Sequence, residues 1–356
     1  MAGRFRRRHP FTSYHSIHPF DYAAAPIHML TLTLPLRWAG MLLLLLLLSV
    51  MAMPISGLAV PRKKLALITG GNKGIGKEIA RRIGMDPEFT AIIACRNVEL
   101  GLAAAEDLRT NSEYECDVIA LPISMDLTDP SSIEAVAHWV EKEYEDGILD
   151  VLINSAAICF NDPTLYGKVQ FTPFQDQAGI TIRTNYFGTL HVIQSFTPLL
   201  KRSSSPRIIN IASAAGRLTI LRSQQLVDAF TSDTLTVPAL SKLMEQFVSD
   251  VESGTHTNKG WPNTCYGMSK LGIIALTRIL AKSHPEMMIN SVDPGYCRTD
   301  QNDNQGTVDP ARGAYTPYLL ALMERDDEEE EGGGEKEAES GLHFYEEQEI
   351  PWTYQS

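Results

Sequence analysis

The feature that most constrains the fold is an alternation of short apolar runs with longer amphipathic stretches from residue 65 onward. The runs have the length of buried strands, and the stretches between them have helical periodicity. We expect strands at Leu65–Thr69, Ala91–Cys95, Val118–Ile123, Val151–Asn154, Arg207–Ala212 and Met288–Val292, and helices at Ile75–Ile83, Val98–Thr110, Ser131–Glu145, Ile180–Leu200 and Tyr266–Ser283. Strands that alternate with helices predict an α/β fold, a doubly wound parallel sheet with helices on both faces.

The alternation predicts one domain over residues 62–356 rather than two. Residues 217–263 interrupt the rhythm and read as a helical insertion before the helix that begins at Tyr266, with a helical piece at Ala239–Val251. Residues 324–340 are strongly acidic and have too little apolar content to fold, so we expect a disordered acidic insertion. After it, Leu342–Tyr345 reads as a short terminal strand.

Residues 1–61 read as a leader outside this domain. Its segment 38–61 carries no charge, includes a run of leucines, and exceeds the roughly 20 apolar residues that span a bilayer. Three interpretations stay open: a secretory or organellar targeting signal, an uncleaved anchor, or a mis-assigned start before Met51 or Met53. Basic residues directly after the segment would keep the body of an anchored protein in the cytosol. Localisation to an organelle, to the secretory pathway or to a membrane is therefore undecided.

Charge and cysteine content exclude several classes of protein. The formal net charge is −12, with +7 over residues 1–64 and −11 over residues 324–356, so residues 65–323 carry the remaining −8. A domain without a basic excess is not expected to bind nucleic acid. The five cysteines form no C-x-x-C pair, so we expect neither a disulfide framework nor a metal site.

A glycine-rich turn follows the first predicted strand and opens the first predicted helix. It contains Gly70, Asn72, Lys73, Gly74, Ile75 and Gly76. Glycines let the backbone approach a phosphate, and the helix N-terminus then supplies N–H groups and the positive end of its dipole. In this position the turn predicts a Rossmann-type dinucleotide site.

Charges after the second strand favour one dinucleotide over another. Arg96 stands where an acidic residue would bind a ribose 2′-hydroxyl, and a cation there suits a 2′-phosphate. Lys73 adds a second positive charge, so we expect NADPH/NADP+. Asp126, after the third strand, is placed to accept a hydrogen bond from adenine; the alternative roles are solvated charges for Arg96 and Lys73 and a helix cap for Asp126.

Four polar residues form a candidate catalytic group. Tyr266 and Lys270 are four apart on one helix, and an ammonium near a phenol is expected to lower the pKa of the phenol, which favours proton transfer. Ser213 follows the fifth strand at the carboxyl edge of the sheet and is placed to donate to the same substrate oxygen. Asn185 lies inside a predicted helix, where asparagine is unfavourable and calls for an explanation. Taken alone, each of these four residues is also compatible with an ordinary structural role, such as a surface pair, a cap or a solvent-facing side chain.

Taken together, these motifs resemble the short-chain dehydrogenase/reductase family, and within it the NADPH-dependent carbonyl reductases. The resemblance covers most of residues 64–323 and rests on Thr69–Gly76, on Asn154 with the residues after it, and on Pro294-Gly295. It implies that Asn185, Ser213, Tyr266 and Lys270 are catalytic. It also implies that Leu127, Asn154 and Thr299 join the residues above, and Tyr266 and Lys270, in cofactor binding.

The resemblance implies reduction of a ketone, aldehyde or quinone to an alcohol by hydride transfer from NADPH, with Tyr266 as the proton donor. Lys270 would assist Tyr266, and Asn185 would hold a water in a proton relay. The alternatives are an alcohol dehydrogenase that runs in the oxidative direction and a cofactor-binding regulatory module without turnover. The long insertion before Tyr266 is typical of monomeric members. A small-molecule carbonyl is the expected partner, with membrane attachment possible through residues 38–61.

Overall fold

The computed structural model describes residues 62–111, 115–160, 171–323 and 340–351. Its centre is one sheet whose strands follow the order β3-β2-β1-β4-β5-β6-β7-β8. The strands are β1 (Lys64–Thr69), β2 (Phe89–Ala94), β3 (Val118–Ala120), β4 (Val151–Asn154), β5 (Arg207–Ile211), β6 (Met288–Asp293), β7 (His343–Tyr345) and β8 (Gln348–Glu349). All pairings are parallel except that of β7 with β8. The predicted doubly wound fold is confirmed.

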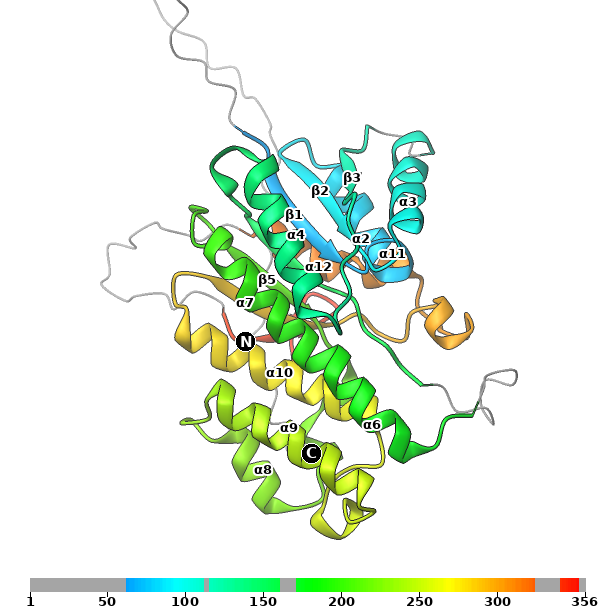
Figure 1. The fold of residues 1–356 in the computed structure, drawn as a ribbon, viewed down its shortest axis with the longest axis vertical. Coiled ribbons are helices and arrows are strands. Elements are labelled where there is room, and N and C mark those ends of the chain that lie inside the picture. The colour runs from blue at the N-terminus through cyan, green and yellow to red at the C-terminus, as the bar shows by residue number, and fades with distance from the viewer. Residues whose placement is uncertain (1–61, 112–114, 161–170, 324–339, 352–356) are drawn as a thin grey trace, which may run out of the picture. The chain divides into compact units, whose positions relative to one another are not determined.

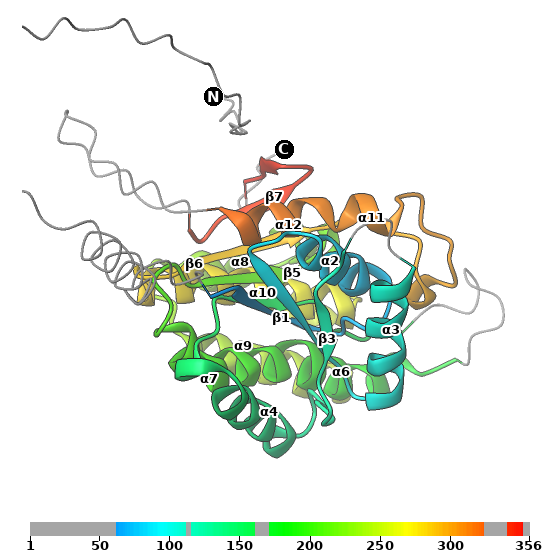
Figure 2. The same ribbon diagram turned by 90° about the horizontal axis from the view of Figure 1, so that it is seen from above.

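Helices cover both faces of the sheet (Figures 1 and 2). One face carries α2 (Gly74–Gly84), α3 (Val98–Thr110), α11 (Pro310–Gly313) and α12 (Tyr315–Leu322). The other face carries α4 (Pro130–Glu143), α6 (Phe174–Ile182), α7 (Thr189–Leu200), α9 (Val237–Glu252) and α10 (Cys265–Ser283). Each face has its own apolar cluster, because strand side chains alternate between the two sides.

Side-chain caps fix where several helices begin. Asn97 accepts a hydrogen bond from the Leu100 amide at the start of α3, and Asp129 caps α4 through the Ser131 amide. Thr264 caps α10 through the Gly267 amide. These caps satisfy amides that have no partner within the first helical turn. The helix predicted over 131–145 is present as α4, with Asp129 as its cap, but it ends at Glu143.

The structure corrects some predicted boundaries. The third strand ends at Ala120 rather than Ile123. Pro122 follows shortly after, and its missing N–H cannot continue a ladder. The helix predicted from Ile180 begins at Phe174 and contains a π-helical turn, η2 (Arg183–Gly188), before α7. The helices α11 and α12 and the strand β8 were not predicted, although the strand expected near Leu342 is present as β7.

The insertion at 217–263 contains the 3₁₀ turn η4 (Leu218–Ile220), α8 (Gln224–Thr231), α9 and the 3₁₀ turn η5 (Thr257–Lys259). The predicted helical piece is α9, which packs against α6 and α10. Phe247 and Trp261 bury their rings edge to face, with centroids 5.7 Å apart. The indole of Trp261 donates to the buried carboxylate of Asp250 over 2.8 Å, and Lys259 donates to it over 2.6 Å. These contacts fix the insertion on the helices of the domain.

Two predictions fall outside the described residues. They are the leader at 1–61, with its segment 38–61, and residues 324–339 of the acidic insertion. Ser340, the last residue of the predicted insertion, accepts a hydrogen bond from the Ile289 amide on β6 and so belongs to the folded domain. Within the described ranges, the structure contains no helix that is both long enough and apolar enough to span a bilayer.

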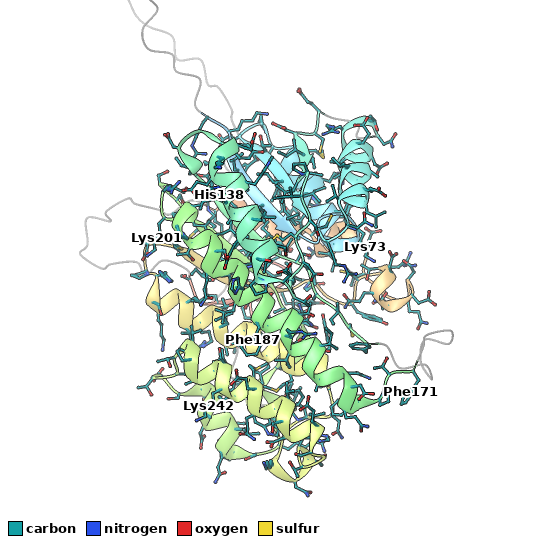
Figure 3. The ribbon with its side chains drawn as sticks, viewed as in Figure 1. Lys73, His138, Phe171, Phe187, Lys201 and Lys242 are labelled. Atoms are coloured by element: carbon teal, nitrogen blue, oxygen red, sulfur yellow. The ribbon has the colours of Figure 1, made fainter. Side chains whose placement is uncertain are left out.

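We predict that Phe247→Ala destabilises the domain by about 3–5 kcal/mol, because it deletes a fully buried ring that packs on Trp261. Chemical denaturation monitored by circular dichroism measures the loss. The control is Lys242→Ala, whose side chain is exposed on the same helix (Figure 3) and is expected to change stability by less than about 0.5 kcal/mol. Equal losses in both variants would show that α9 is not anchored through its buried face.

Candidate active site

The glycine-rich turn lies between β1 and α2. In the sheet, β1 stands between β2 and β4, and the order of the strands changes direction at this point. Gly74 has φ +55°, which favours glycine, and a Cβ at Gly76 would lie 2.6 Å from the Gly70 carbonyl oxygen. Lys73 is the N-cap residue of α2 and makes no side-chain cap. Asn72 and Ile75 lie in the same turn. The turn therefore presents backbone amides and a helix N-terminus at the switch point where α/β sheets bind ligands.

The two predicted phosphate-binding cations lie at this edge in different surroundings. The ammonium of Lys73 pairs with Asp300 over 3.3 Å, which joins the glycine-rich turn to the 3₁₀ turn η6 (Asp300–Asn302) after β6. Both side chains are exposed, so the pair is weak. The guanidinium of Arg96, just past β2, is exposed and makes no ion pair with the described residues. Both side chains can therefore bind a phosphate without breaking a strong ion pair.

The other residues predicted to bind a cofactor also follow strands at this edge. Asn154 ends β4 and is buried; its amide donates to Asn210 over 2.9 Å, while its own carbonyl oxygen has no partner among the described residues. Asp126 accepts from the amide and hydroxyl of Thr128 and so closes a local turn, whereas the cap of α4 is Asp129 rather than Asp126. Leu127 packs closely under Gly188. Thr299 contacts the Gly74 position and closes a capping box with Asn302.

The candidate catalytic residues Tyr266, Ser213 and Lys270 converge where α10 crosses the ends of β5 and β6. The phenol of Tyr266 is hydrogen-bonded to the side chain of Ser213, which lies between β5 and the 3₁₀ turn η3 (Ala214–Gly216). The ammonium of Lys270 lies 5.5 Å from the centroid of the Tyr266 ring and donates to the Ile211 carbonyl over 2.6 Å. A Cβ at Gly216 would lie 2.5 Å from the Lys270 backbone, so η3 rests directly on the helix.

The pKa values of the pair differ from the expectation. Burial raises the pKa of Tyr266 above its ordinary value, although a hydrogen bond from Gln301 and one from Ser213 lower it. Burial also lowers the pKa of Lys270 to about 8, against the nearby Cys159 and Asp293, which raise it. The ammonium is directed to the Ile211 carbonyl and the ring face rather than to the phenol oxygen. The prediction that Lys270 lowers the pKa of Tyr266 is therefore not supported; the phenol is protonated at neutral pH.

Comparison with known proteins identifies the family. Residues 64–224 match the family model described as short chain dehydrogenase. Over 273 residues the chain is 36% identical to carbonyl reductase (NADPH) 1 of Mus musculus, covering 74% of this chain and 92% of the relative. It is 32% identical over 314 residues to (+)-neomenthol dehydrogenase of Capsicum annuum, covering 79% and 95%. The chain belongs to the short-chain dehydrogenase/reductase family.

A solved member of the family has the same fold. Salutaridine reductase from Papaver somniferum superposes with a TM-score of 0.68 at 26% identity, covering 79% of this chain and 99% of that one. The match spans nearly the whole of a relative that is itself a reductase.

Asn185 supports the loop after β4 rather than facing solvent. It lies in the π-helical turn and is almost fully buried. Its side-chain oxygen accepts from the Ile158 amide over 2.8 Å, and its amide donates to the Ile158 carbonyl over 2.9 Å and to Ser269 over 3.0 Å. These bonds explain an asparagine inside a helix and tie the loop to α10, next to Lys270.

The structure adds three residues that sequence reasoning did not place in the catalytic group. Gln301 of η6 is hydrogen-bonded to Tyr266, and Asp293 at the end of β6 is buried near Lys270. Burial raises the pKa of the Cys159 thiol to about 11, against the nearby Lys270, so the thiol is protonated at neutral pH. Each of these residues lies within six positions of Asn154 or Thr299, which indicates the same edge of the sheet. The sequence does not show, however, which way their side chains point.

Proposed function

We propose that this chain is an NADPH-dependent carbonyl reductase in which Tyr266 protonates the substrate oxygen. The observation that carries the proposal is the meeting of Ser213 at the phenol and Lys270 at the ring of Tyr266, at the edge of the sheet that also holds the glycine-rich turn. Relatives named as NADPH carbonyl reductases, aligned over 92% of their length, support the reaction class and the cofactor.

The residues of the site bind the carbonyl oxygen, transfer the proton to it and hold the surrounding loop in place. NADPH, when bound, supplies the hydride that reduces the carbonyl carbon. The hydroxyls of Ser213 and Tyr266 donate hydrogen bonds to the carbonyl oxygen, and Tyr266 then gives up its proton. The Lys270 ammonium stabilises the negative charge that this transfer leaves on the phenol oxygen. Asn185 keeps the loop at Ile158 in place on one side of the site.

The residues at the nucleotide edge fit the cofactor. The turn at Gly74 and Gly76 leaves no room for side chains beside the backbone amides of α2. Asn154 has a buried carbonyl oxygen that can accept a hydrogen bond. Lys73 and Arg96 are exposed cations where a 2′-phosphate is expected, and binding a phosphate at Lys73 would replace its weak pair with Asp300.

We also propose an apolar carbonyl substrate and a monomeric enzyme. Among the described residues, four large hydrophobic side chains are exposed, and two of these, Phe171 and Tyr296, belong to the segments that follow β4 and β6 (Figure 3 labels Phe171). The helix α9 covers α6 and α10, which supports the predicted monomer. Attachment to a membrane through residues 38–61 stays a prediction.

We predict that Tyr266→Phe lowers kcat for carbonyl reduction by roughly 10²–10⁴-fold, because the variant keeps the ring and loses the proton donor. NADPH oxidation followed at 340 nm with a panel of quinones, ketones and aldehydes measures it. The control is Tyr144→Phe, which removes the hydroxyl of a half-buried tyrosine at the C-terminal cap of α4 and is expected to retain full activity. Full turnover in Tyr266→Phe would disprove the assignment of the proton donor.

We predict that Arg96→Met and Lys73→Met each raise the KM for NADPH by roughly 10–100-fold, since each removes one charged contact with the 2′-phosphate. The KM for NADH is expected to change little, because NADH lacks this phosphate. Steady-state kinetics with both cofactors test the prediction, and Lys242→Met is the control for loss of an exposed cation. Equal changes for NADPH and NADH would show that the cations do not read the 2′-phosphate.

We predict that kcat/KM for the carbonyl falls as the pH rises through about 8. Burial lowers the pKa of Lys270 to about 8, so the ammonium is present below that pH and is lost above it. Tyr266, whose pKa is raised, stays protonated across the same range. Rates at saturating NADPH between pH 6 and 10 measure the profile, and a flat profile would contradict a role for the charged form of Lys270.

A further inference from the structure

Asp293 is a buried carboxylate next to the proposed catalytic group. It is the last residue of β6, pairs with Tyr345 of β7, and has 5% of its surface exposed. Side chains alternate along a strand, so Asp293 shares a face with Ile289, which packs in the apolar cluster that includes α10. Asp293 therefore faces the helix that carries Tyr266 and Lys270.

The carboxylate of Asp293 connects two turns of the site. It accepts a hydrogen bond from the Gly295 amide over 3.0 Å, within the Pro294-Gly295 turn that leads towards Thr299. It also accepts from the backbone amide of Ala214, the residue after Ser213. One side chain thus ties the turn of Ser213 to the turn beyond β6, and both turns border the substrate oxygen's proposed position.

Charged and titratable groups surround Asp293 from several elements. Lys270 of α10 and Arg217 after η3 are the cations near it, and Cys297, Tyr266 and Tyr345 are the titratable neighbours whose pKa values its negative charge raises. Burial raises the pKa of Asp293, while the two amides and the two cations lower it. For Lys270, the negative partners are Asp293 and, when ionised, Cys159.

We propose that Asp293 is a positioning residue of this active site, whose carboxylate holds the Ser213 turn against the Pro294-Gly295 turn and supplies the negative charge that balances the Lys270 ammonium. The inference rests on the proposed function, since it acts through Ser213 and Lys270. A buried ammonium needs such a balance, because its desolvation favours the neutral amine. Asp293 would thereby extend to higher pH the range in which Lys270 is charged.

The test is the pH profile of Asp293→Asn. Asparagine keeps the volume and one acceptor for the turn amides but removes the charge. We expect the alkaline limb of kcat/KM to move down by roughly 1 pH unit, and kcat below the limb to fall by roughly tenfold with little change in KM. Asp309→Asn removes an equal charge from an exposed helix cap nearby and is expected to leave both unchanged.

The outcomes separate this inference from the proposed function. If folded Asp293→Asn has the limb and the kcat of the unaltered protein while Tyr266→Phe is inactive, the role of Asp293 is wrong and the proposed function stands. If Tyr266→Phe keeps full turnover, the proposed function itself fails. If Asp293→Asn does not fold, carboxyl ¹³C NMR of aspartate-labelled protein decides: Lys270→Met must raise the pKa of Asp293, and an unchanged pKa would overturn the inference.

Discussion

The arrangement of this site depends on a buried ammonium. Lys270 has 4% of its surface exposed on α10, and a charge in that position requires partners in place of water. It finds them in the Ile211 carbonyl of β5, in the ring face of Tyr266, and in the negative charge of Asp293 on β6. These partners come from two strands and one helix. The ammonium therefore keeps all of them only when α10 lies on the sheet in this one alignment. The same alignment brings Tyr266 onto Ser213.

Much of the fold could be predicted because it depends on local patterns. The apolar runs at Leu65–Thr69 and Val151–Asn154 became strands within a residue of the predicted bounds, since fully buried parallel strands need continuous apolar sequence. The glycine-rich turn could be placed because Gly74 and Gly76 meet steric requirements that no other residue meets. The π-helical turn around Asn185 could not, because it arises from bonds between the side chain of Asn185 and a loop 27 residues away.

The sequence predicted which residues form the candidate site better than it predicted their pKa values. Spacing placed Tyr266 and Lys270 on one helix face, and the strand order placed Ser213 at the same edge. Spacing does not show depth of burial, and burial decides the pKa values: it raises that of Tyr266 and lowers that of Lys270. For the same reason Asp293 and Gln301 went unnoticed, since their side-chain directions follow from the register of β6 and the course of η6. Lys73 was placed correctly in the turn, but its pairing with Asp300 joins residues 227 positions apart.

The central claim, that this chain transfers a hydride from NADPH to a carbonyl carbon, is tested most directly by isotope transfer. The protein would be incubated with NADPH deuterated at the transferable position and an aromatic ketone, and the product examined by mass spectrometry and NMR. The account predicts one deuterium per molecule of alcohol, bound to the former carbonyl carbon of a ketone, and none when deuterium is supplied as D₂O alone. Tight NADPH binding without carbon-bound deuterium in any product, across a panel of ketones and aldehydes, would contradict it.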